Sequence, residues 1–202
     1  EYDRELYGRN APHQSIGRTI TMLNYFEHMG QQLAKEFERR HCDHQFFPQL
    51  ARIVLQQQKL PALDDQKILD VLTTPGLPQQ RLDDQFGDLS VTLFHHRHFR
   101  IDLLGWLNAS TSIHQHAFSG AFRVWKGSSV HSIYRFEEKQ RFNTMLRFGK
   151  VSQERCEYLK AGDVRMIESG AALTHAVFHL EAPTYSIVIR THSEPWNSPQ
   201  FN

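Results

Sequence analysis

Cysteine is scarce in this 202-residue chain. The two cysteines, Cys42 and Cys156, are far apart in the sequence and form no CxxC motif. Two isolated cysteines cannot supply the disulfide framework that is typical of small secreted domains. The sequence therefore favours a reducing compartment, and we expect a cytoplasmic protein.

Long apolar runs and an excess of one charge are also missing. No stretch approaches 18 consecutive apolar residues, and no signal peptide is visible, so we expect no membrane-spanning segment. The chain has 23 Lys and Arg against 22 Asp and Glu, with no long basic run. This balance excludes the charge pattern of a nucleic-acid or membrane-surface binder. A small molecule is the expected partner.

Histidine is abundant instead. The chain contains 13 histidines, whereas an average composition would give roughly a third to a half of that number. Histidines that are spaced so that their side chains meet could bind a metal ion or take part in catalysis.

The first half of the chain has helical periodicity. Apolar residues recur every three or four positions over 14–41 and over Phe47–Gln58, and Asp64 is a good N-cap for a third helix, Asp65–Leu72. We predict a helical N-terminal region, residues 1–88, that packs on the rest of the chain.

From Leu89 onward the pattern changes to short strands. β-branched and aromatic residues alternate with polar ones, and turn signals recur every 8 to 12 residues, which is typical of a sandwich or barrel. The predicted class is mostly β with a helical N-terminal region (α+β), with a barrel over residues 89–202. After the strand that starts at Leu89, the expected strands are 112–125, 130–136, 144–148, 155–159, 164–167, 175–180 and 185–191, with a hairpin tip at 137–142.

The segment with the clearest chemistry is Ser112-Ile-His-Gln-His-Ala-Phe-Ser-Gly120. Residues two apart on a strand face the same side, so His114 and His116 point together. Phe118, Gly120 and Phe122 continue that face. Two imidazoles on an apolar face would bury polar nitrogens at a cost of roughly 1–3 kcal/mol each. A bound metal ion removes this cost because it uses the nitrogens as ligands.

These residues resemble the cupin superfamily. Its first motif has a HxH pair, three or four residues, a glutamate, six residues and a glycine; here the corresponding residues are His114, His116, Gly120 and Gly127. Its second motif has a glycine-led turn and then a histidine, here Gly162-Asp163, Glu168-Ser-Gly170 and His175. The resemblance covers about half of the chain and implies a cupin-type jelly-roll barrel with a metal on His114, His116 and His175.

Gly120 stands where cupins have a glutamate ligand, which leaves three neutral histidines. Such a site is similar to that of the thiol dioxygenases, cupins that oxidise cysteine-like thiols with Fe(II) and O2. The resemblance implies a non-heme iron dioxygenase acting on a small thiol or another metal-chelating molecule. Tyr185 is then a candidate catalytic residue, and Arg165 and Arg190 are candidates for substrate binding.

Several alternatives stay open. The metal could be Zn, Mn or Ni in a hydrolase or isomerase, or the protein could be a non-enzymatic cupin that binds a small ligand. His179, on the same strand face as His175, could be a fourth ligand, a residue that hydrogen-bonds to a metal ligand, or an ordinary polar residue. The cluster His95, His96 and His98 is most simply a solvated strand face. The helical region could also form a homodimer contact.

Overall fold

Three helices precede the strands, as the sequence predicts. The computed structural model describes residues 13–73, 76–78, 80, 87–108, 111–143, 146–194 and 200–201. Its helices are α1 (His13–Arg39), α2 (Phe47–Gln57) and α3 (Asp65–Thr73). At the start of α3, the Asp64 side chain accepts a hydrogen bond from the backbone N–H of Lys67 at 2.8 Å, so the expected N-cap is present. None of the described helices is both long and apolar enough to cross a membrane.

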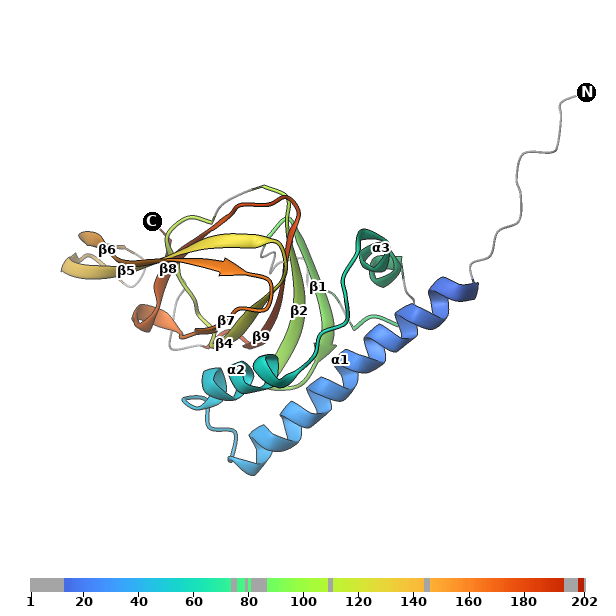
Figure 1. Ribbon diagram of the computed structural model, residues 1–202. Coiled ribbons are helices and arrows are strands. Elements are labelled where there is room, and N and C mark those ends of the chain that lie inside the picture. The colour runs from blue at the N-terminus through green and yellow to red at the C-terminus, as the bar shows by residue number, and fades with distance from the viewer. Residues whose placement is uncertain are drawn as a thin grey trace, which may run out of the picture.

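Two five-stranded antiparallel sheets form the barrel (Figure 1). The first sheet has the order β1-β2-β9-β4-β7 and the second β10-β3-β8-β5-β6. The strands are β1 (Leu89–His95), β2 (Phe99–Trp106), β3 (His114–Gln115), β4 (Gly120–Lys126), β5 (Ser128–Arg141), β6 (Arg147–Lys160), β7 (Val164–Ile167), β8 (Thr174–His179), β9 (Thr184–Thr191) and β10 (Gln200–Phe201). The predicted class, a mostly β jelly-roll barrel preceded by helices, is confirmed.

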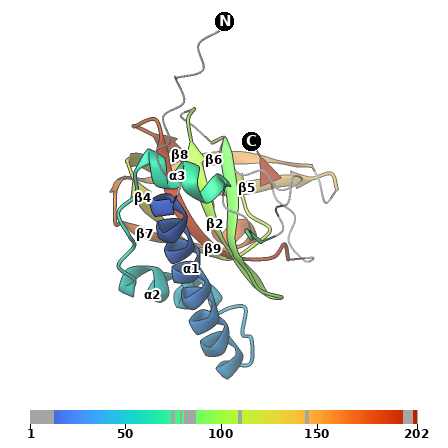
Figure 2. The same cartoon turned by 90° about the vertical axis from the view of Figure 1, so that its right-hand side faces the viewer.

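The first sheet is buried on both faces. Its outer face packs against the helices (Figure 2) through one apolar cluster that includes Phe26, Leu33, Ile101 and Ile187. Its inner face contributes Leu104, Phe122 and Val188 to a second cluster inside the barrel. This arrangement explains why β2 and β9 read as nearly continuous apolar runs. It also means that the helical region and the barrel share one core.

The β5–β6 hairpin is longer than predicted. β5 continues to Arg141 and β6 begins at Arg147, so residues 137–141 of the predicted tip belong to β5. The distal parts of both strands are largely exposed, and Figure 1 shows the hairpin projecting from the barrel. The sequence prediction ended β5 too early because it followed burial periodicity, which an exposed two-stranded ribbon does not need.

Candidate metal centre

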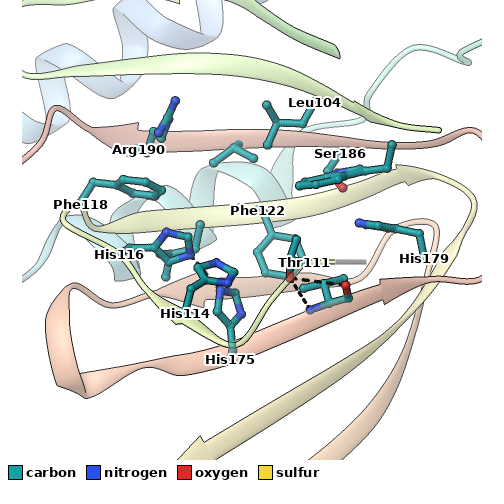
Figure 3. Close-up of a pocket in the computed structure, with 14 residues that line it drawn as sticks. Leu104, Thr111, His114, His116, Phe118, Phe122, His175, His179, Ser186 and Arg190 are labelled. Atoms are coloured by element: carbon teal, nitrogen blue, oxygen red, sulfur yellow. Dashed lines mark hydrogen bonds between the residues drawn. The ribbon is translucent and has the colours of Figure 1, made fainter. Parts of the chain in front are cut away.

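Three buried histidines converge inside the barrel. His114 lies on β3, His116 follows it at a bridge to Ser169, and His175 lies on β8 directly opposite His114 in the sheet. Each side chain offers one ligand nitrogen, and these nitrogens lie within 4.8 Å of one another. All three residues are 3–4% exposed. The structure thus brings together the three residues that the sequence pointed to as ligands (Figure 3).

Burial keeps these imidazoles neutral. It lowers the pKa of His114 and lowers the pKa values of His116 and His175 well below their usual range, and the neighbouring imidazoles reinforce the shift for the last two. A neutral imidazole is the form that ligates a metal. His114 Nδ1 lies 2.7 Å from the carbonyl oxygen of Ser112. A carbonyl only accepts, so Nδ1 carries the proton and the lone pair is on Nε2.

A chain of hydrogen bonds sets the tautomer of His175. Arg165 donates to both oxygens of Glu157, at 2.9 and 2.8 Å. Glu157 Oε1 lies 3.0 Å from His131 Nδ1, and His131 Nε2 lies 2.8 Å from His175 Nδ1. Arg165 and His131 hold the pKa of the Glu157 carboxyl down at about 2, so Glu157 only accepts. His131 then donates to Glu157 and accepts from His175.

The consequence is that His175 presents a lone pair at Nε2. This atom lies 2.8 Å from Nε2 of His116. Two facing imidazole nitrogens at this distance need either a shared proton or a cation between them. The residues present therefore fit a metal ion: they are neutral and convergent, and two of them are oriented by partners on their other nitrogen.

The sequence offered no sign of the roles of His131 and Glu157. His131 and His175 are 44 positions apart and become diagonal neighbours because β5 pairs with β8. His131 and Glu157 are direct cross-strand partners on β5 and β6. Only strand pairing, which no local motif encodes, makes this chain of contacts.

We expect the Glu157→Gln variant to bind metal about 10–100-fold more weakly, as is typical when the partner of a metal-binding histidine is lost. A glutamine is uncharged and can donate as well as accept, so the tautomer of His175 is no longer fixed. The dissociation constant for Co(II), measured by competition with a coloured chelator, tests this. Glu154→Gln is the matched control, because Glu154 lies on the same strand but pairs with exposed Arg135. Unchanged affinity in Glu157→Gln would refute the role of the chain.

Gly120 cannot be replaced by the glutamate of the usual cupin site. A Cβ atom at this position would lie 2.0 Å from the carbonyl oxygen of Ile189 and 2.8 Å from the Cα of Arg190. Both are backbone atoms of β9, the neighbouring strand, and cannot move aside. The absence of a carboxylate ligand is thus built into the close approach of β4 and β9.

Gly120→Ala should destabilise the protein by roughly 3 kcal/mol, the upper end of the usual cost of overpacking. Urea denaturation monitored by circular dichroism gives the change. Gly76→Ala is a suitable comparison: its cost comes from the backbone φ of +95° alone, because its Cβ would meet nothing within 4 Å. It should cost only about 1 kcal/mol. Equal costs for the two variants would argue against the steric explanation.

A largely apolar pocket adjoins the three histidines (Figure 3). Its free interior volume is about 60 Å³. Its apolar wall comes from the inner faces of both sheets and the segment after His116: Leu104, Trp106, Phe118, Phe122, Ile167, Val177 and Val188. His179, Ser186 and Arg190 add polar groups. A narrow, largely apolar space of this kind suits a slender small molecule rather than a bulky one.

Of the two predicted substrate-binding arginines, only Arg190 lines this pocket. Its guanidinium lies over the Phe118 ring, 4.6 Å from the centroid, and its Nε donates to Asp102 at 2.8 Å. Arg165 is instead engaged with Glu157, as described above. The prediction for Arg165 as a direct substrate contact is therefore not supported, because its position serves His131 and His175.

Tyr185 points away from the pocket. It lies on β9 next to Ser186, which faces the pocket, and alternation turns Tyr185 to the helical side of the sheet. There it belongs to the apolar cluster shared with the helices and packs near Gly105. This position does not support the predicted catalytic role of Tyr185. Because both faces of β9 are buried, its sequence pattern gave no indication of which face was inside.

His179 is outside the group of metal-ligand nitrogens, which within the described residues comprises His114, His116 and His175 alone. Four residues along β8 separate it from His175, which corresponds to about 13 Å. His96 and His98 also differ from expectation. They lie in the turn between β1 and β2, beyond the end of the strand at His95.

Stability should depend on pH through His179. Burial lowers its pKa to about 4 in the folded protein, against about 6.5 when unfolded. The unfolded chain binds the proton first, so this contribution is complete above about pH 6.5 and is lost as the pH falls through 4. Its upper limit is about 3 kcal/mol. The urea midpoint should therefore decrease less between pH 7 and pH 4.5 in His179→Leu than in the wild type. An identical decrease in both proteins would contradict this assignment.

Neither the protein-family models nor the curated proteins include a match to this chain. Solved structures do. A sugar phosphate isomerase of the cupin superfamily from Silicibacter pomeroyi has 16% identity and a TM-score of 0.40 over 56% of this chain and 64% of its own. A cupin superfamily protein from Desulfitobacterium hafniense has 18% identity and a TM-score of 0.36 over 57% and 94%.

An oxalate oxidase has 17% identity and a TM-score of 0.34 over 51% of this chain. The match spans 45% of the oxalate oxidase chain, less than half its length. The similar structures thus include cupins, some of them enzymes, and the similarity is confined to about half of this chain.

Proposed function

We propose that this protein is a metal-dependent cupin oxygenase that uses Fe(II) and O2 to oxidise a small thiol or another metal-chelating molecule. One observation carries the proposal: three neutral histidines, two of them oriented by partners, converge beside a small apolar pocket, and Gly120 stands where the resemblance expects a carboxylate ligand. When bound, the iron would supply the redox chemistry with dioxygen. A thiolate and one O2 molecule give a sulfinate, so the reaction balances without an added reductant.

The charge of the site favours an anionic substrate. Three neutral ligands leave the +2 charge of the ion uncompensated. Inside the barrel, Arg100 and Arg190 both pair with Asp102 through Nε, at 2.9 and 2.8 Å. Arg190 thereby places a guanidinium group in the pocket wall. A thiolate or carboxylate that enters the pocket is attracted by both.

The apolar residues of the pocket have a separate role. Phe118 packs against His116, with ring centroids 4.4 Å apart. Phe122, on β4, lines the same pocket. Their side chains exclude water from the reacting end of the pocket. Water exclusion strengthens the attraction between the ion and an anionic group, and it limits competition by water for the metal.

Metal analysis and oxygen consumption test the proposal. Protein purified without a histidine tag is reconstituted with Fe(II) under anaerobic conditions and then exposed to oxygenated buffer with cysteine, cysteamine or 3-mercaptopropionate. We expect about one iron per chain, with O2 uptake matched by sulfinate formation, and no uptake in His116→Ala. Stoichiometric zinc as isolated, with no O2 uptake after iron reconstitution, would favour Lewis-acid chemistry and refute the proposal.

A further inference from the structure

His179 is a polar residue at the end of the pocket opposite the three metal-binding histidines. Its ring stacks on Trp106, with centroids 4.6 Å apart and planes 21° from parallel. Its Nδ1 lies 2.9 Å from the Ser129 hydroxyl. These two contacts fix the ring on both its face and one edge. Figure 3 shows the side chain directed into the pocket from the side away from His114, His116 and His175.

The other ring nitrogen of His179 is left for a ligand. The whole residue is only 6% exposed. Nε2 is buried and has no hydrogen-bond partner among the described residues. Buried polar atoms nearly always find a partner, since leaving one unpaired costs free energy. No role in the metal centre accounts for this atom. Its placement in the pocket wall makes a bound molecule the natural partner.

We propose that the pocket binds an extended small molecule whose metal-coordinating end lies at the three histidines and whose neutral hydrogen-bonding end, such as a hydroxyl or an amide, lies at Nε2 of His179. This inference rests on the proposed metal site and adds the substrate class to it. His179 is then the residue that selects the distal end of the substrate.

The lining between the two ends sets the character of the molecule. Leu104, Phe122 and Val188 are apolar and face the pocket between the polar ends, so the body of the ligand is a hydrocarbon chain or ring. The backbone of β8 separates His175 and His179 by about 13 Å, a distance that a chain of about six carbon atoms bridges together with one coordination bond and one hydrogen bond.

The distal group of the ligand is uncharged. His179 is neutral near pH 7, because burial lowers its pKa to about 4, so it is no counter-ion for a second carboxylate. Its Ser129 contact suits either tautomer, since a hydroxyl both donates and accepts. Nε2 can therefore donate or accept, and a ligand hydroxyl satisfies both cases.

Two hydroxamates that differ only at the distal end provide the probe. Hexanehydroxamate and 6-hydroxyhexanehydroxamate share the metal-binding head and the chain length, and acetohydroxamate supplies the head alone. Their dissociation constants are measured by calorimetry on tag-free protein loaded with Co(II), whose visible spectrum reports binding at the metal. We expect the wild type to bind the hydroxyl compound about 2–10-fold more tightly than the methyl compound, the usual net value of one hydrogen bond.

Variants locate the effect. His179→Leu should reverse the preference, because the hydroxyl would be buried against an apolar side chain. Ser129→Ala, which removes only the partner of Nδ1, should reduce the preference while Co(II) binding stays unchanged. His98→Leu, a histidine outside the pocket, should keep the full wild-type preference.

The outcomes separate the two proposals. If acetohydroxamate perturbs the Co(II) spectrum but the hydroxyl gives no advantage in the wild type, the assignment of His179 is wrong and the metal site stands. A preference that survives in His179→Leu overturns the assignment in the same way. If the protein takes up no Co(II), or acetohydroxamate leaves its spectrum unchanged, the proposed metal function fails, and the inference fails with it.

Discussion

His116→Ala should abolish stoichiometric metal binding. The free energy of metal binding in protein sites, about 10–16 kcal/mol, is shared among three or four ligands, so the loss of one ligand weakens binding roughly 100-fold or more. We expect tag-free wild-type protein to carry about one metal ion per chain by plasma mass spectrometry, and the variant to carry less than about a tenth of that after dialysis. His116 is buried beside Phe118, so circular dichroism is needed to show that the variant is folded.

The control for this experiment is His95→Ala. His95 is exposed at the end of β1, and its loss should leave the metal content unchanged. A chelator should lower the melting temperature of the wild type, because a ligand that binds only the folded state stabilises it, and should have no effect on His116→Ala. Full metal content in His116→Ala would show that the ion lies elsewhere.

Asp102→Asn should lower the free energy of unfolding by about 3–5 kcal/mol, the usual cost of breaking a buried ion pair. Asp102 is 0% exposed. It accepts hydrogen bonds from Nε of Arg190 and from the Thr92 hydroxyl, at 2.8 and 2.9 Å, and Arg100 Nε lies 2.9 Å away. The substitution keeps the size of the side chain but leaves two buried guanidinium groups without this carboxylate.

Urea denaturation of the metal-free protein, with a chelator in all samples, isolates this effect from metal binding. Glu154→Gln is the comparison, since its ion pair with Arg135 is on the exposed hairpin and should contribute less than about 1 kcal/mol. If Asp102→Asn costs no more than Glu154→Gln, the buried pair does not stabilise the barrel as we infer. An unchanged denaturant slope would show that both states keep their compactness.

Gly120 and Gly127, the two glycines that match the spacing of the cupin motif, are required for different structural reasons. Gly127 has a backbone φ of +90° between β4 and β5, a conformation that favours glycine. Gly120 is required because β9 approaches too closely for any side chain. The sequence indicated that a glutamate ligand was missing; the structure adds that the backbone leaves no place for one.

Local periodicity alone determined much of this protein. The 3.6-residue repeat of apolar side chains located α1 and α2, and the N-cap residue Asp64 located α3. Alternation placed His114 and His116 on one inner face. These features depend on residues that are near each other in the sequence. The spacing of a HxH pair before a glycine is likewise a local property, so the sequence alone predicts these two candidate ligands.

Strand pairing decided the rest. His175 joins His114 only because β3 and β8 are neighbours, and His131 and Glu157 reach His175 only through β5 and β6. His179 lies four residues beyond His175 on β8, so the length of the strand separates it from the metal ligands. The position of β9 between β2 and β4 turns Tyr185 to the helical face of the sheet. A strand whose two faces are both apolar carries no sequence mark of which face lines the pocket, because burial against the helices and burial inside the barrel select the same side chains.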